Sequence, residues 1–204
     1  MTVFLLDLST LTDETEKRLL ATLPPWRHAL AERCRDPKAR RAGVAGFCLV
    51  RYALGQLSPA TDAESWCFTP LGKPYLLGEC APHFNLSHTA HLAAVAISLD
   101  AAVGVDVEEI KPHQAGLARR ICSPAQLAAV RHAADPADEV VRIWSAKEAF
   151  SKCTGGGMGK DIRNIPTDGV SSTRIDTLSP GHYLSVYPRP PVLTLVWVSA
   201  EELN

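Results

Sequence analysis

The spacing of apolar and polar positions predicts a strand and two helices in the first part of the chain. The apolar run at residues 2–8 predicts a strand, and residues 13–23 predict a short helix that two prolines end. A long helical pattern begins at Pro37 and continues through Leu54. The Pro- and Gly-rich segment 69–74 predicts a loop.

Two apolar runs near the middle of the chain predict two further strands. Residues 91–99 are apolar almost throughout, as in a buried strand. Residues 100–102 can form a turn, and residues 103–107 are a second strand candidate. Because the two runs are adjacent in sequence, we expect them to pair as antiparallel neighbours.

Two helix starts follow in the second half of the chain. Ser123 can cap a helix that has Pro124 at its first position and continues to about Ala134. Asp135 then begins a second helix, which ends near Cys153 before three consecutive glycines.

Strands and turns are expected over residues 162–198, with 193–198 as the clearest strand. The whole pattern therefore predicts an α+β fold with two comparable halves, residues 1–100 and residues 101–204.

Two acidic residues lie on the strand predicted at residues 103–107 and just beyond it. Side chains on a strand alternate between faces, so Asp106 and Glu108 point to the side opposite Val105 and Val107. Two neighbouring carboxylates repel each other unless a positive charge lies between them. Mg²⁺ commonly takes one or two protein carboxylates together with waters and substrate phosphates. An acidic, half-exposed strand face is the simpler interpretation, and the triplet alone is weak evidence against it.

The second predicted helix carries a third acidic residue. Trp144, Glu148 and Lys152 follow one another at intervals of four and share one stripe of the helix. Glu148 and Lys152 could form an ordinary surface pair, stabilising by only about 0.2–0.5 kcal/mol. The tryptophan on the same stripe indicates that the stripe is partly covered, and a covered Glu and Lys need partners. Glu148 is thus a candidate metal ligand or general base, and Lys152 a candidate phosphate clamp.

Composition and charge argue against several classes of protein, including nucleic-acid-binding and membrane-spanning proteins. The net charge of −1 gives no support for nucleic-acid binding. No apolar run approaches the length of a membrane span, and the six scattered cysteines show no metal-binding spacing. We therefore expect a cytoplasmic protein without a membrane or nucleic-acid partner. Residues 27–51 carry seven basic residues against two acidic ones, which indicates a solvated helix face or a site for a small polyanion.

Three motifs occur in order along the chain. They are Phe84–Thr89 (FNLSHT), Gly104–Glu108 (GVDVE) and Trp144–Lys152 (WSAKEAFSK). Together they closely resemble the 4′-phosphopantetheinyl transferase superfamily, whose patterns are F-N-x-S-H, G-[VI]-D-[VI]-E and W-x-x-K-E-[AS]-x-x-K. The resemblance extends over roughly residues 40–157. This chain is about twice as long as the short holo-carrier-protein synthases, which are trimers, and so it resembles the Sfp type.

The resemblance implies a monomer in which two similar α+β halves pack as a pseudo-dimer, with the active site in the cleft between them. It implies a Mg²⁺-dependent enzyme that transfers the 4′-phosphopantetheine arm of coenzyme A to a serine of an apo acyl or peptidyl carrier protein. Adenosine 3′,5′-bisphosphate would be released.

The resemblance also assigns roles to individual residues. The implied metal ligands are Asp106, Glu108 and Glu148. The implied catalytic residues are Glu148, Lys152 and Asp106. The implied coenzyme A contacts are Arg40 or Arg41, Lys73, Ser87, His88 and Lys152.

Two other functions are compatible with the same residues. One is a different Mg²⁺-dependent enzyme that transfers or hydrolyses phosphoryl groups of a nucleotide. The other is a non-catalytic module that binds coenzyme A or a carrier protein. The pathway of the carrier protein, whether fatty acid, polyketide, peptide or siderophore synthesis, is not encoded in these motifs.

Overall fold

The computed structural model describes residues 1–64, 66–111, 115–159 and 161–203, and the chain divides into two compact units. Unit 1 comprises Met1–Ala102 and Val192–Asn204, and unit 2 comprises Val103–Pro191. Both units combine helices with a sheet, so the α+β class expected from the sequence is confirmed. The segment from Val192 onward was expected to belong to the second half of the chain, residues 101–204. Its strand instead pairs with the first strand of the chain, so the segment belongs to unit 1.

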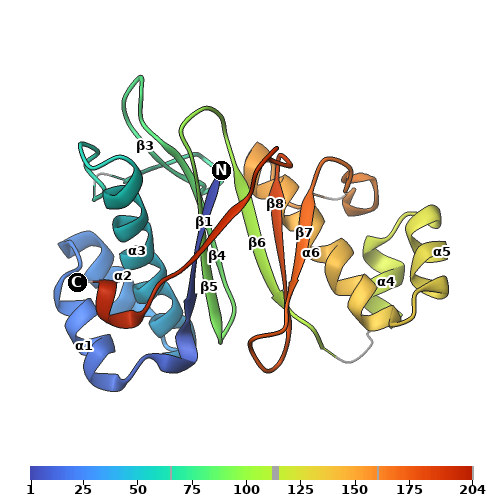
Figure 1. The fold of residues 1–204 in the computed structure, drawn as a ribbon, viewed down its shortest axis with the longest axis horizontal. Coiled ribbons are helices and arrows are strands. Elements are labelled where there is room, and N and C mark those ends of the chain that lie inside the picture. Colours follow the sequence, from blue (N-terminus) through green and yellow to red (C-terminus); the bar gives the residue numbers. More distant parts are fainter. Residues whose placement is uncertain (65, 112–114, 160, 204) are drawn as a thin grey trace. The chain divides into compact units, whose positions relative to one another are not determined.

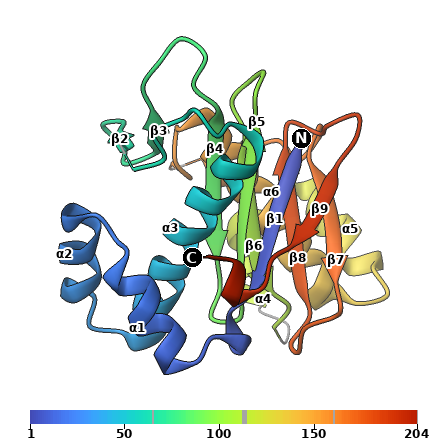
Figure 2. The same cartoon turned by 60° about the vertical axis from the view of Figure 1, so that its left-hand side comes forward.

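Unit 1 is built on a four-stranded sheet with the order β4-β5-β1-β9 (Figure 1). Its strands are β1 (Thr2–Asp7), β4 (His83–His88), β5 (Leu92–Ser98) and β9 (Thr194–Trp197). Neighbours pair antiparallel except β1 and β9, which are parallel. The long helix α3 (Pro37–Leu57) packs on this sheet (Figure 2), and its buried face forms most of the core of the unit.

Shorter elements complete unit 1. They are η1 (Leu8–Thr10), α1 (Asp13–Ala21), α2 (Pro25–Arg33), the hairpin β2 (Trp66–Phe68) and β3 (Pro74–Leu76), and η3 (Ala200–Leu203). The expected loop at 69–74 is largely the turn of this hairpin, where the Thr69 N–H donates to the Lys73 carbonyl at 2.9 Å.

Unit 2 is built on a three-stranded antiparallel sheet with the order β6-β8-β7. Its elements are β6 (Gly104–Glu109), α4 (Ala115–Ile121), α5 (Pro124–His132), α6 (Pro136–Thr154), η2 (Ile162–Asn164), β7 (Ser171–Ile175) and β8 (His182–Tyr187). Helix α6 packs along the sheet, chiefly on β6 and β8 (Figure 1).

The predicted helix boundaries in unit 2 are confirmed. Ser123 caps α5 in a reciprocal arrangement with Gln126. Asp135 caps α6, and Gly155 ends it in the left-handed conformation with φ 72°.

The predicted antiparallel pair of residues 91–99 and 103–107 is wrong. Strand β5 has β4 on one side and β1 on the other, so both of its hydrogen-bonding edges are occupied. Strand β6 pairs with β8 instead. Adjacency in sequence favours pairing only while an edge is available.

None of the helices in the described ranges combines the length and the apolar character that crossing a membrane requires.

Candidate active site

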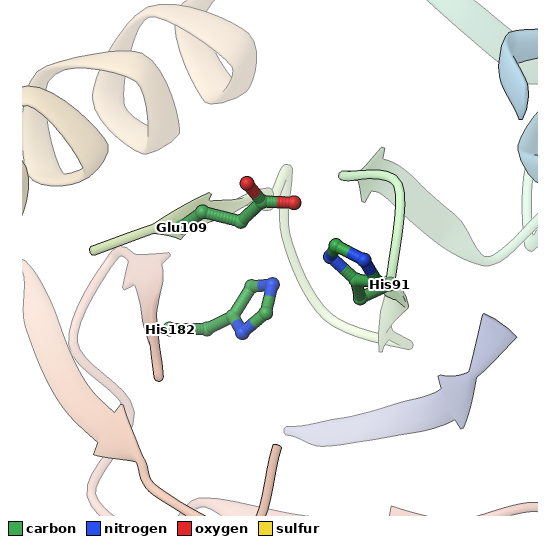
Figure 3. Close-up of side chains that lie close together, drawn as sticks. All are labelled: His91, Glu109 and His182. Carbon is green, nitrogen blue, oxygen red and sulfur yellow. The ribbon is translucent and has the colours of Figure 1, made fainter. Parts of the chain in front are cut away.

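The acidic face of β6 is the starting point of the site. Strand alternation places Asp106 and Glu108 together, as predicted. Asp106 is only 2% exposed, and Glu108 is half-buried. The next residue, Glu109, belongs to the opposite face and stands across from His182 where β6 and β8 pair (Figure 3). The carboxylate of Glu109 is therefore separate from this acidic pair.

Helix α6 brings its predicted stripe against this acidic face. The Trp144 indole N–H donates to Glu108 Oε1 at 2.7 Å. Two turns further on, the Lys152 ammonium group donates to Asp106 Oδ1 at 2.6 Å. Glu148 lies between them on the helix and is half-buried. The stripe is thus partly covered, and Lys152 is part of an ion pair with a buried carboxylate.

A glycine at the start of β6 makes this close packing possible. A Cβ atom built on Gly104 would lie 2.0 Å from the carbonyl oxygen of Ala149 and 2.5 Å from the amide nitrogen of Cys153, both in α6. Such contacts are with backbone atoms, which cannot rotate away as a side chain can. The absence of a side chain at Gly104 therefore sets the distance between β6 and α6.

Asp106, Glu108 and Glu148 place three carboxylates in one partly buried site. Burial, followed by repulsion from Asp106, raises the pKa of Glu108 to about 7, although the Trp144 N–H and Lys152 act in the opposite direction. Burial and the charge of Asp106 also raise the pKa of Glu148, while Lys152 lowers it. Three carboxylate groups, two of which have their charged forms destabilised by burial and by neighbouring carboxylates, are a suitable oxygen ligand set for a hard divalent cation. The residues present therefore fit a Mg²⁺ site.

The raised pKa of Glu108 predicts a measurable pH dependence of stability. The pKa lies above the ordinary glutamate value of 4.5, so the folded metal-free protein retains a proton that the unfolded chain releases. The contribution of Glu108 to stability is complete below about pH 4.5 and is lost as the pH rises through about 7. In EDTA, we expect Glu108→Gln to gain thermal stability relative to the unsubstituted protein between pH 5 and pH 8, because glutamine cannot ionise. A difference in unfolding temperature that does not change with pH would contradict this assignment.

Polar side-chain contacts fix α6 to its surroundings. The fully buried Lys147 donates to the Ile162 carbonyl at 2.9 Å and to the Arg163 carbonyl at 3.0 Å. Near the start of the helix, Asp138 accepts hydrogen bonds from Tyr183 of β8 and Arg174 of β7. These contacts limit rotation of the helix and hold its stripe of Trp144, Glu148 and Lys152 over β6.

Two candidate phosphate-binding residues lie at the start of α3 in unit 1. The Arg40 Nε is 3.1 Å from one oxygen of Glu16, and the Arg41 Nε is 2.9 Å from the other. Arg41 also donates to Asp13 at 2.5 Å. Arg41 lines a hollow of about 270 Å³, whereas Arg40 does not. The full lining consists of Leu8, Ser9, Pro37, Lys38, Arg41, Ala42, Ala90 and His91.

The other predicted coenzyme A contacts also belong to unit 1. Lys73 is half-buried at the hairpin turn between β2 and β3. Ser87 is buried and His88 is exposed, both at the end of β4. In unit 2, the structure brings together Asp106 and Lys152, two of the residues predicted for the metal and phosphate site.

Sequence reasoning missed the roles of three residues. Gly104 and Lys147 enter the sequence analysis only as members of motifs, and Trp144 only as a sign that its helix stripe is partly covered. A covered tryptophan usually finds an acceptor for its N–H. The carboxylates of Asp106 and Glu108 were candidate acceptors, but the sequence does not show where their strand lies relative to the helix. No local signal indicates that Lys147 would reach the carbonyls of Ile162 and Arg163, which lie 15 and 16 residues further along the chain.

Comparisons with known proteins agree with the α+β fold class. A family model described as the 4′-phosphopantetheinyl transferase superfamily matches residues 102–187, which include β6 and α6. The chain is 29% identical to 4′-phosphopantetheinyl transferase psf-1 of Bacillus pumilus, covering 94% of this chain and 91% of that protein. It is 33% identical to 4′-phosphopantetheinyl transferase HetI of Nostoc sp., covering 74% and 68%. It is 31% identical to 4′-phosphopantetheinyl transferase AcpT of Escherichia coli, covering 79% and 77%.

The chain therefore belongs to the 4′-phosphopantetheinyl transferase superfamily and is an enzyme of this transferase class.

Proposed function

We propose that this protein transfers the 4′-phosphopantetheine arm of coenzyme A to a serine of an apo acyl or peptidyl carrier protein in a Mg²⁺-dependent reaction. The observation that carries the proposal is the cluster of Asp106, Glu108, Glu148 and Lys152 within the family-matched segment. The match to psf-1 over nearly the full length of both chains further supports phosphopantetheinyl transfer by the whole chain.

Asp106, Glu108 and Glu148 are the residues that would hold the cation. When bound, Mg²⁺ would neutralise part of the charge on the pyrophosphate of coenzyme A. The proposed cationic contact for phosphate oxygens is Lys152, whose side chain stays 29% exposed while its ammonium group contacts Asp106.

The transfer requires a base for the serine hydroxyl. A bond forms between the serine oxygen and the phosphorus that carries pantetheine, and the bond from that phosphorus to the bridging oxygen breaks. Adenosine 3′,5′-bisphosphate leaves, and the serine proton passes to Glu148, directly or through a water. Burial raises the pKa of Glu148, which makes its carboxylate a stronger base than an exposed glutamate.

The proposed coenzyme A contacts in unit 1 are Arg41, Lys73, Ser87 and His88, with Arg41 preferred to Arg40. Arg41 faces the hollow at the N-terminus of α3, where the helix dipole favours an anion. We therefore expect Arg41→Gln to weaken coenzyme A binding more than Arg40→Gln does. If Arg41 binds the 3′-phosphate, this difference between the two variants disappears when 3′-dephospho-coenzyme A replaces coenzyme A.

The direct test of the proposed function is intact-mass measurement of apo carrier proteins. The full chain is incubated with coenzyme A, Mg²⁺ and carriers from fatty acid, polyketide and peptide synthesis. We expect one carrier or more to gain the mass of one phosphopantetheine group, and EDTA or a serine-to-alanine carrier to prevent the gain. Nucleotide hydrolysis without carrier modification would favour a different phosphoryl-transfer enzyme. Coenzyme A binding without transfer or hydrolysis would favour a binding module.

A further inference from the structure

The hydrogen bond from the Trp144 indole restricts the orientation of the Glu108 carboxylate. An indole N–H is a donor only, and its ideal partner in this environment is a carboxylate oxygen. At 2.7 Å from the indole nitrogen, Glu108 Oε1 is held in a short hydrogen bond. The orientation of the carboxylate group then determines where its second oxygen, Oε2, points.

Packing and helix contacts fix the position of the Trp144 side chain. Trp144 packs against the apolar cluster beneath α4, α5 and α6, which contains Ile121, Val130 and Ile143. An indole side chain has only two rotatable bonds, so packing on one side fixes the direction of its N–H. The contacts of Lys147 and Asp138 hold the helix that carries it.

Glu108, by contrast, has more conformational freedom, which this contact restricts. It is half-buried near the end of β6 and borders a hollow of about 180 Å³ that is also lined by Trp144, Lys111 and Leu117. A glutamate side chain has three rotatable bonds, so without a fixed partner it could adopt several orientations, including ones directed into that hollow.

We propose that Trp144 is a positioning residue that fixes the Glu108 carboxylate through Oε1 and thereby directs Oε2, together with Asp106, toward a divalent cation. This inference rests on the proposed function in one respect, the assignment of Glu108 as a cation ligand. Partners that orient ligand groups in this way typically change metal affinity by about 10–100-fold when they are removed.

The test is Mn²⁺ binding to the full chain, measured by the electron paramagnetic resonance signal of free Mn²⁺, with and without coenzyme A. Trp144→Phe keeps the aromatic ring and removes the N–H, and we expect it to weaken Mn²⁺ binding about tenfold. Trp197→Phe is the matched control, because Trp197 is a partly exposed residue of β9 in unit 1. Its Mn²⁺ affinity should equal that of the unsubstituted protein.

A double-mutant cycle separates positioning from packing. If Trp144 acts through Glu108, then Trp144→Phe should have no further effect on Mn²⁺ affinity in a Glu108→Gln background. An additional tenfold loss in that background would mean that Trp144 acts on the site by packing alone, and would overturn the inference.

The two proposals fail in different ways. Absence of Mn²⁺ binding by the unsubstituted protein would overturn the cation site and this inference with it. Equal Mn²⁺ affinity of the unsubstituted protein and Trp144→Phe would overturn this inference alone.

A measurement that does not depend on folding of the tryptophan variant complements the cycle. The chain has four tryptophans, so an ¹⁵N-labelled sample should give four indole N–H resonances. We expect the Trp144 resonance to move in Glu108→Gln and to respond to added Mg²⁺, while the Trp197 resonance does not change. An unchanged Trp144 resonance in Glu108→Gln would contradict the hydrogen bond itself.

Discussion

Replacement of Asp106 by asparagine is expected to reduce phosphopantetheine transfer by about three orders of magnitude or more. The substitution removes a negative charge from a nearly fully buried position where Lys152 and the proposed cation both need it. Charge stabilisation by a bound metal contributes several kcal/mol to such reactions, and each 1.36 kcal/mol corresponds to a factor of about ten in rate. The rate of mass gain by an apo carrier protein, with coenzyme A and Mg²⁺ saturating, is the measurement.

Two further variants show whether the loss is specific to the site. Asp168→Asn changes an exposed carboxylate of unit 2 outside the cluster and should leave the rate unchanged. Glu148→Gln should lower the rate to a similar extent as Asp106→Asn, whether Glu148 is a ligand, a base or both. Retained activity in Asp106→Asn, together with a normal unfolding transition, would refute the assignment of the site.

Replacement of Gly104 by alanine is expected to destabilise the protein by about 3 kcal/mol or more and to abolish transfer. Overpacking usually costs about 1–3 kcal/mol, and more where the obstructing atoms cannot move. Here the new methyl group would lie 2.0 Å from the Ala149 carbonyl oxygen, so α6 must move away from β6. That movement would separate Trp144 from Glu108 and Lys152 from Asp106. Denaturant unfolding monitored by circular dichroism measures the loss of stability.

Gly116→Ala provides the matched control for this effect. Gly116 lies in α4 of the same unit, and a Cβ atom built there has no neighbour within 4 Å. Because alanine is a better helix former than glycine, the stability of this variant should be unchanged or slightly higher. If Gly104→Ala were as stable and active as Gly116→Ala, the close contact between β6 and α6 would not be essential for the site.

Local periodicity predicted the two halves of the candidate active site separately. Strand alternation placed Asp106 and Glu108 on one face, and helical spacing placed Trp144, Glu148 and Lys152 on one stripe. Both predictions depend only on residues close in sequence, for which the geometry of strands and helices is sufficient. Capping residues likewise predicted the starts of α5 and α6.

The pairing of elements distant in sequence was beyond such reasoning. The pattern suggested that residues 91–99 pair with 103–107, whereas β6 pairs with β8, about eighty residues further along. The strand expected at 193–198 exists, but its partner is β1 at the other end of the chain. Several apolar strands could satisfy either edge equally well, so hydrophobicity alone does not select the partner.

The sequence by itself determined the α+β class, the acidic pair on β6, the stripe on α6 and the resemblance to the transferase superfamily. Each of these follows from residue types at fixed local spacing. Only the tertiary structure decided that Lys152 contacts Asp106 and that Trp144 contacts Glu108. Those contacts depend on how closely and at what register a helix lies on a strand. That distance is set by the missing side chain of Gly104, and the register by buried contacts such as those of Lys147.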